Sequence, residues 1–130
     1  AQLYGLDASE TVDRALAAAG LADRADDMVS AFSRGMRQRL ALERSLLHGP
    51  RLVLLDEPFT GLDDHAVHIV SARFQRLAAE GAIVVLATHD LDLAESLITR
   101  MAVVQNGRLL SDAVAGAGVR RQYRALVGSA

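Results

Sequence analysis

Residues 52–63, LVLLDEPFTGLD, constrain the fold more than any other stretch of this chain. Four apolar residues follow one another without alternation, which is typical of a β-strand buried on both faces of a parallel sheet. The run then ends in two adjacent acids, Asp56 and Glu57, and in a proline, which has no N–H for a sheet. Because a core does not hold unpaired carboxylates, we expect this strand to lead out to the edge of a sheet.

Helical and strand patterns alternate along the whole chain. Apolar residues with helical spacing, capping residues and apolar runs predict helices over residues 8–19, 34–48, 64–79, 91–98 and 119–127, and strands over 52–55, 82–87 and 101–105. The run at 82–87, AIVVLA, is expected to be a second buried strand. Asn106 and Gly107 predict a tight turn into residues 108–111. This alternation predicts an α/β fold with a largely parallel sheet.

Composition narrows the functional classes. The chain has 130 residues and a net charge of -2, which argues against a basic surface for nucleic acid. It has no cysteine, which excludes disulfides and thiolate metal sites and suits a cytosolic protein. The longest apolar run is far shorter than the roughly 20 residues of a membrane span, and no signal peptide is visible. The first residue is Ala rather than Met, which hints at a fragment or a processed chain.

Polar residues are predicted to gather at the carboxyl edge of the sheet, where open α/β sheets bind ligands. Asp56 and Glu57 follow one strand, and Thr88, His89 and Asp90 follow another. One carboxylate there can hold Mg²⁺ through water beside a nucleotide phosphate. The next residue of an extended chain points to the other side, where it can address an attacking water. The alternative is a solvated acidic loop, but the position of these groups directly after apolar strands favours the phosphate site.

The segment before this strand, FSRGMRQRLALERSLLHGP, places Ser33 and Gly35 at the start of a helix. Unpaired N–H groups and the helix dipole allow such a terminus to bind phosphate. Arg34, Arg37 and Arg39 lie in the same first turns, where cations oppose the dipole. Either these arginines are solvated, or an anionic partner compensates the cost.

Taken in order, these motifs resemble those of the ATP-binding cassette (ABC) ATPases. SRGMRQRLALERSLL looks like the signature motif and its helix, LVLLDE like the Walker B strand with its catalytic glutamate, TGLD like the D-loop, and His89 like the switch histidine. The resemblance extends from about residue 3 to residue 111. It implies part of a P-loop NTPase-type three-layer sandwich, with about 3–49 in the helical subdomain and about 50–130 in the catalytic core.

The resemblance also implies a role for each residue of the acidic and histidine motifs. Asp56 would position Mg²⁺ through water, and Glu57 would polarise the water that attacks ATP. His89 would contact the γ-phosphate and sense its loss. Asp63, in the D-loop, would reach across a dimer interface.

The signature motif would serve the partner's nucleotide. Ser33 and Gly35, with Arg34 between them, would hold the γ-phosphate of an ATP bound mainly by a second nucleotide-binding domain, so that two domains close head-to-tail. The family usually has Leu-Ser-Gly-Gly-Gln here, whereas this chain reads FSRGM. Arg34 therefore replaces a glycine and Met36 a glutamine, and these two substitutions bear on the strength of the phosphate contact.

A larger departure is that GxxxxGK[ST], the P-loop that cradles the β- and γ-phosphates, occurs nowhere in the 130 residues. The family's glutamine loop is missing too. We therefore expect a fragment that begins inside the helical subdomain, with AQLYGL as its first segment, and that spans roughly the last three-fifths of a nucleotide-binding domain. Because it has no P-loop to hold the triphosphate, such a fragment is expected to be inactive toward ATP. It is also expected to be poorly stable, because the family's P-loop strand, which it lacks, lies between the strands matching 82–87 and 101–105.

The function that the resemblance implies is an ATP-binding and hydrolysing subunit of a transporter, coupled to separate transmembrane permease subunits. Such a subunit would be cytoplasmic and peripheral on the inner face of the membrane, and it would bind no nucleic acid. Two alternatives stay open. One is a non-transport ABC-type ATPase of translation or DNA repair, and the other is a catalytically inactive ABC-like binding module. The membrane subunits would select the substrate, so this sequence does not name it.

Overall fold

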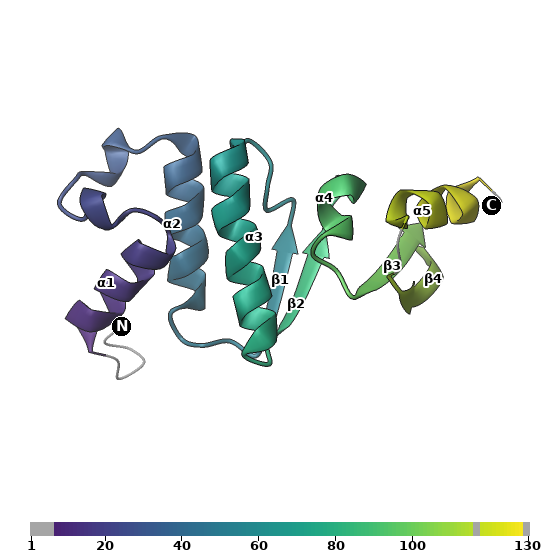
Figure 1. The fold of residues 1–130 in the computed structure, drawn as a ribbon, viewed down its shortest axis with the longest axis horizontal. Coiled ribbons are helices and arrows are strands. Elements are labelled where there is room, and N and C mark those ends of the chain that lie inside the picture. The colour runs from purple at the N-terminus through teal and green to yellow at the C-terminus, as the bar shows by residue number, and fades with distance from the viewer. Residues whose placement is uncertain (1–6, 116–117, 129–130) are drawn as a thin grey trace. The chain divides into compact units, whose positions relative to one another are not determined.

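The computed structural model describes residues 7–115 and 118–128, and it falls into two compact units that meet between Ala87 and Thr88 (Figure 1). The AQLYGL segment lies outside the described residues. The first unit contains α1 (Ala8–Ala18), the 3₁₀ turns η2 (Ala22–Arg24) and η3 (Val29–Ala31), α2 (Arg34–Leu46), β1 (Leu52–Asp56), α3 (Asp64–Ala79) and β2 (Ile83–Ala87). The second contains α4 (Leu91–Glu95), β3 (Arg100–Gln105), β4 (Arg108–Val114) and α5 (Val119–Val127).

The predicted helices are present, and their starts follow from side-chain caps. The Asp7 carboxylate accepts from the Glu10 N–H at 3.0 Å, and the Asp63 carboxylate accepts from the Ala66 N–H at 2.7 Å. The helices α3 and α5 have the predicted bounds. The helix α2 ends at Leu46, two residues before the predicted end, and α4 is a short helix that ends three residues early.

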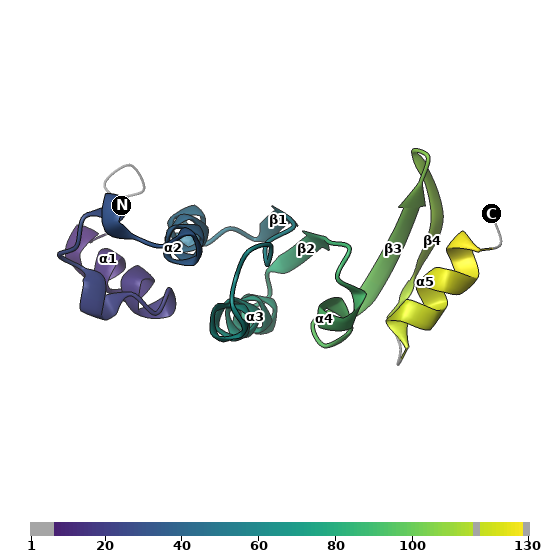
Figure 2. The ribbon, with the colours of Figure 1, turned by 90° about the horizontal axis from the view of Figure 1, so that it is seen from above.

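The strands β1 and β2 form a parallel pair in register, with Leu54 opposite Val85 and Asp56 opposite Ala87. The prediction that both strands are buried on both faces is wrong. Leu54 is 69% exposed and Val85 47% exposed, while Val53, which precedes Leu54 in β1, is buried. The helix α3 packs on one side of this pair (Figure 2), and within the described residues of the first unit no other element covers the opposite side.

The covered face is built by α3. Ala66, Val70, Phe74 and Leu77, which recur at helical spacing, are its buried residues. The Phe74 ring meets the Phe59 ring edge-on with centroids 5.7 Å apart. The helix α2 joins this core through an ion pair in which the Arg73 Nε donates to the buried Glu43 carboxylate at 2.8 Å. Because the pair is buried, removal of either partner would leave an uncompensated charge and destabilise the fold.

The second unit is built around an antiparallel hairpin of β3 and β4. Asn106 and Gly107 connect the strands with φ angles of 51° and 74°, as expected for a tight turn that requires positive φ at both positions. Met101 and Val103 of β3 pack on Val119 of α5 and form its core. The largely parallel sheet that was predicted is thus present as the β1–β2 pair, while β3 pairs with β4 rather than with β2.

Polar contacts fix α5 to α4. The Glu95 carboxylate accepts from the Gly118 N–H at 2.7 Å at the start of α5. The Arg120 guanidinium forms a two-bond ion pair with Asp92, and this hydrogen bonding raises the pKa of Arg120. None of the helices that the structure describes has both the length and the apolar character needed to cross a bilayer.

Candidate functional site

The acidic pair lies at a sharp turn at the carboxyl end of β1. Asp56 is the last strand residue, and the Glu57 N–H donates to the Ala87 carbonyl at 2.8 Å, so β1 and β2 end level. Glu57 then takes a φ of 46°. The prediction that Glu57 continues an extended chain is therefore wrong. The left-handed conformation costs a non-glycine residue roughly 1–2 kcal/mol, and such strain is common at functional sites.

Asp56 is chemically suited to a hard cation. Its side chain is exposed and makes no ion pair among the described residues. Carboxylate oxygens are the ligands that Mg²⁺ prefers, usually with water and substrate phosphates completing the shell. Within residues 7–115 and 118–128, no group of three or more His, Asp or Glu could hold a metal. A Mg²⁺ at Asp56 would therefore take its remaining ligands from water and phosphate.

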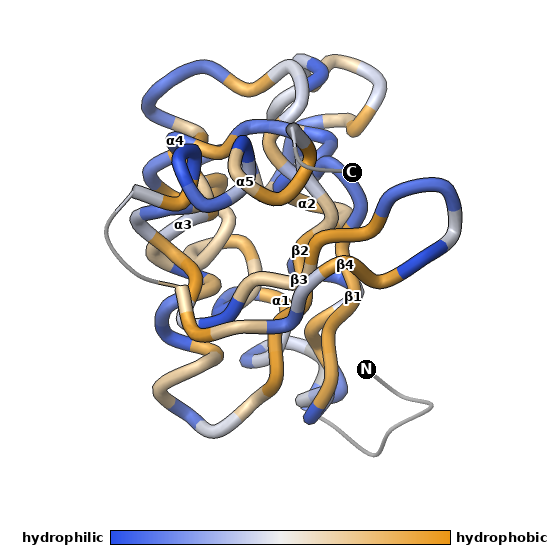
Figure 3. Tube along the Cα trace, turned by 90° about the vertical axis from the view of Figure 1, so that its right-hand side faces the viewer, coloured by the Kyte–Doolittle hydropathy of each residue, from blue (hydrophilic) through white to orange (hydrophobic). Residues whose placement is uncertain are grey.

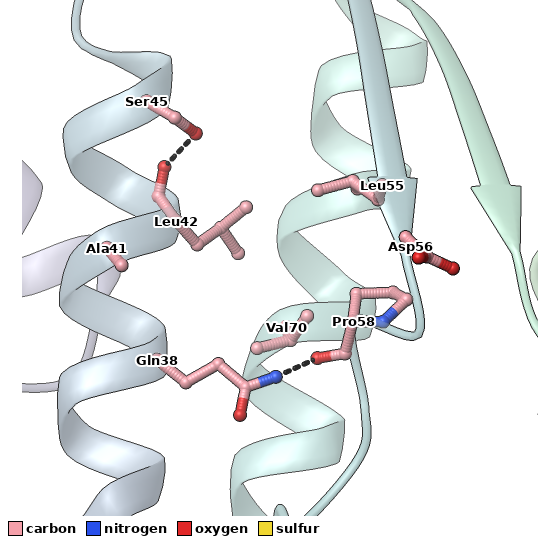
Figure 4. A pocket seen from close by; sticks show the side chains of 8 residues that line it. All are labelled: Gln38, Ala41, Leu42, Ser45, Leu55, Asp56, Pro58 and Val70. Carbon is pink, nitrogen blue, oxygen red and sulfur yellow. Dashed lines mark hydrogen bonds between the residues drawn. The ribbon is translucent and has the colours of Figure 1, made fainter.

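A shallow cavity of about 260 Å³ lies between α2 and the end of β1, with Asp56 at its edge (Figure 4). Its wall is largely apolar, with Ala41, Leu42 and Val70 among the lining residues. Across it, the Gln38 side-chain amide donates to the Pro58 carbonyl at 2.6 Å. This bond ties the middle of α2 to the loop that follows the acidic pair. The motif comparison used Gln38 only as part of the signature helix and missed this contact, which joins residues 20 positions apart.

The start of α2 lies beside the same loop. The Ser33 hydroxyl accepts from the Met36 N–H at 3.2 Å, so it caps the helix and keeps its own hydrogen for another acceptor. A Cβ on Gly35 would lie 3.5 Å from Leu62, which is ordinary contact. The structure therefore brings the predicted signature residues Ser33, Arg34 and Gly35 next to the predicted D-loop.

The three arginines of these turns differ in their contacts. Arg37 donates to the Phe32 carbonyl and Arg39 to the Ala19 carbonyl, so both are used within the fold. Arg34 is exposed and has no hydrogen bond or ion pair within the described part of the chain. A Cβ on Gly61 would lie 3.0 Å from its Cζ. Of these three arginines, Arg34 is therefore the one whose guanidinium is either solvated or bound to an anionic partner.

Asp63 and His89 are placed by local structure. Asp63 is the N-cap of α3, so its carboxylate already accepts a backbone hydrogen bond. His89 is exposed and is the second residue of the second unit, between Thr88 and Asp90. The Thr88 hydroxyl accepts from the Asp90 N–H at 3.1 Å, and Asp90 caps α4. Thr88 and Asp90 therefore form the start of α4. The sequence pattern alone did not distinguish this capping role from ligand binding.

Comparison with known proteins tests the predicted resemblance. The ABC transporter family model matches residues 3–60. A Nod factor export ATP-binding protein I from Rhizobium sp. (strain N33) is 41% identical over 103 residues, which cover 79% of this chain and 34% of that protein. The corresponding protein of Rhizobium meliloti is 43% identical over 94 residues, 72% of this chain and 28% of that protein. This chain resembles the ABC transporter ATPases, as its motifs predicted. It spans about a third of the length of these curated relatives.

Solved structures show the same fold. An ATP-binding subunit of an ABC transporter is similar with a TM-score of 0.82 and 29% identity, over 97% of this chain and 58% of that one. The ADP conformation of MJ1267, an ATP-binding cassette of an ABC transporter, matches with a TM-score of 0.78 at 21% identity, over 92% of this chain and 48% of that chain. The predicted α/β fold of the P-loop NTPase type is therefore confirmed for this part of an ABC ATPase.

Proposed function

We propose that this chain forms the signature and Walker B part of a subunit that binds and hydrolyses ATP to power an ABC transporter. The observation that carries the proposal is the pair Asp56 and Glu57 at a strained turn after a parallel strand, with Glu57 at a φ of 46°. The similarity to ABC transporter ATPases and the order of the four motifs support it. In phosphoryl transfer, one carboxylate can position the metal while another orients the nucleophile.

The proposed roles follow the chemistry of each side chain. The exposed Asp56 carboxylate would hold Mg²⁺ through water, and the half-buried Glu57 would accept the proton of the attacking water. His89 would donate to the γ-phosphate. When bound, Mg²⁺ would neutralise the charge that develops on the phosphate oxygens.

The start of α2 would serve a second nucleotide-binding domain. Ser33 would donate its free hydroxyl hydrogen, and the backbone at Gly35 would approach the γ-phosphate of the partner's ATP. The unpaired Arg34 guanidinium adds positive charge to this surface, and Asp63 would reach the partner from its position at the start of α3.

The partners proposed are therefore a second such domain and transmembrane permease subunits, with the protein held at the inner face of the cell membrane. The relatives are named as export proteins, which favours export over import for this chain. The named Nod factor substrate belongs to those relatives, and we extend only the direction of transport to this protein.

The decisive experiment is Glu57→Gln in the full-length natural protein. The amide keeps the shape and the backbone conformation but loses the ability to accept a proton, so steady-state phosphate release is expected to fall by about 100-fold or more while ATP binding is retained. Glu80→Gln is the matched control, because Glu80 is an exposed acid at the other end of α3. Phosphate release near the unmodified rate in Glu57→Gln would reject the assignment.

The 130 residues alone are proposed not to hydrolyse ATP, because they contain no GxxxxGK[ST] segment to hold the triphosphate. The same phosphate-release assay on the isolated chain tests this. Turnover by the isolated chain would contradict it.

A further inference from the structure

We infer that Gln38 and Arg34 are positioning residues that fasten the loop 58–63, which runs from Glu57 to the start of α3, to the helix α2. This inference rests on the proposed function for its effect on ATP hydrolysis, but the contact itself is independent of it. Both side chains come from one face of α2, because residues four apart in a helix lie one above the other.

The Gln38 contact is the stronger of the two. Its side-chain amide donates to the Pro58 carbonyl at 2.6 Å in a partly buried position. Pro58 directly follows Glu57, so this bond fixes the peptide adjoining the strained carboxylate residue. A hydrogen bond that is partly shielded from water is costly to lose when one partner is left unsatisfied.

Arg34 supplies the second contact at the other end of the loop. The Cζ, Nε and NH1 atoms of its guanidinium lie 3.0 to 3.2 Å from where a Cβ on Gly61 would be. Three atoms of one plane at similar distances indicate that the flat guanidinium packs against the Gly61 backbone. Gly61 has a φ of 77°, so both its conformation and this close approach require the absence of a side chain.

The loop between these contacts also has turns of its own and one buried aromatic ring. The Thr60 N–H donates to the Glu57 carbonyl at 3.2 Å, and the Leu62 N–H donates to the Phe59 carbonyl at 3.1 Å. Phe59 is buried against Phe74. Gln38 and Arg34 are therefore two contacts through which a shift of α2 would reach the loop that follows Glu57.

The first test measures the loop directly in the full-length natural protein. Gln38→Met keeps the length of the side chain but removes the donor. Hydrogen exchange at the amides of Thr60 and Leu62 is expected to speed up by about 2- to 12-fold, the range that one net hydrogen bond allows. Arg44→Lys is the control, since Arg44 is exposed in the last turn of the same helix. Unchanged exchange in Gln38→Met would overturn the inference.

A second test uses the coupling between Arg34 and Gly61. Gly61→Ala places a Cβ against the guanidinium and strains a residue at positive φ, so it should loosen the loop. In an Arg34→Ala background the steric part disappears, and the effect of Gly61→Ala on exchange is expected to be at least about twofold smaller. Additive effects would show that the two residues do not interact.

The kinetic test separates positioning from simple stability. Gln38→Met is expected to lower kcat for ATP hydrolysis by about threefold or more with a KM for ATP that changes by less than about twofold. Looser exchange with an unchanged kcat would overturn the positioning role. If the unmodified protein hydrolyses no ATP, the proposed function fails, and the exchange measurements still decide whether the loop is fastened to α2.

Discussion

The β1–β2 pair and the β3–β4 hairpin are alike in that each packs one face on a helix, but their open faces differ. On β1–β2, the open face carries four exposed aliphatic residues, Leu52, Leu54, Ile83 and Val85. Figure 3 colours the trace of these two strands as largely hydrophobic. On the hairpin, exposed aliphatic residues are mixed with an ion pair in which Arg100 donates to Asp112 at 2.8 Å.

This difference shows that a strand's composition and its burial are separate properties. The runs LVLL and IVVLA have the composition of strands covered on both sides, yet each is covered on one side in this structure. A continuous exposed aliphatic surface tends to associate with other surfaces, whereas a face broken by charges is compatible with water. Substitutions on the two faces of β1–β2, and then on the hairpin, test this difference.

The largest effect is expected on the covered face. Phe74→Ala removes a ring that is 3% exposed and packs edge-on against Phe59, so it should lower the free energy of unfolding by about 3–5 kcal/mol. Because domain stability is only about 5–15 kcal/mol, the variant should lose most or all of its cooperative transition. Urea unfolding followed by circular dichroism measures this.

Leu54→Ala is the matched control for that experiment, since Leu54 lies on the open face. Its effect on the free energy of unfolding should stay within about 0.5 kcal/mol. Comparable losses in the two variants would mean that both faces are covered in solution and would remove the contrast between them.

A smaller effect is expected for association of the isolated chain. Leu54→Lys places a charge in the centre of the aliphatic surface, and losing burial of one leucine, worth about 1.5–3 kcal/mol, should weaken self-association by about tenfold or more. Sedimentation across a range of concentrations measures it. Val104→Lys on the hairpin, which also replaces an exposed aliphatic residue, is the control and should change association much less. Equal effects of the two lysines would contradict the difference between the open faces.

Local signals explain which parts of the fold the sequence predicts. The bounds of α3 follow from a capping aspartate and a helical repeat of apolar residues, both contained within the segment itself. The turn at Asn106 and Gly107 follows from two residues that tolerate positive φ. The burial of β1 was mispredicted because an apolar run shows only that a strand can be buried on both faces. Which faces are covered depends on the tertiary structure.

The residues of the candidate site were predicted from local motifs, whereas their conformation and contacts were not. The motifs identify Asp56, Glu57 and His89 as residues of interest, because each follows an apolar strand. The conformation of Glu57 was missed, since no residue type in DEP requires a positive φ. The bond from Gln38 to Pro58 was missed too, because it depends on how α2 packs beside β1 and leaves no local pattern.

The smallest effect is expected for the ion pair that distinguishes the hairpin. Arg100 and Asp112 have side chains that are 63% and 50% exposed, so solvent screens their attraction, and an exposed pair contributes only about 0.2–1 kcal/mol. Arg100→Met keeps the aliphatic stem and removes the charge, and Asp112→Asn keeps the shape of its partner. A double-mutant cycle on unfolding free energies should give a coupling in that range at low salt, which fades near 1 M salt as the screening length falls to about 3 Å.

Arg100→Met also makes the hairpin's open face more like that of β1–β2, because it replaces a charge with an apolar side chain. Self-association should therefore rise as the coupling is lost, and a variant that stays as monomeric as the unmodified chain would indicate that the aliphatic residues alone set the difference.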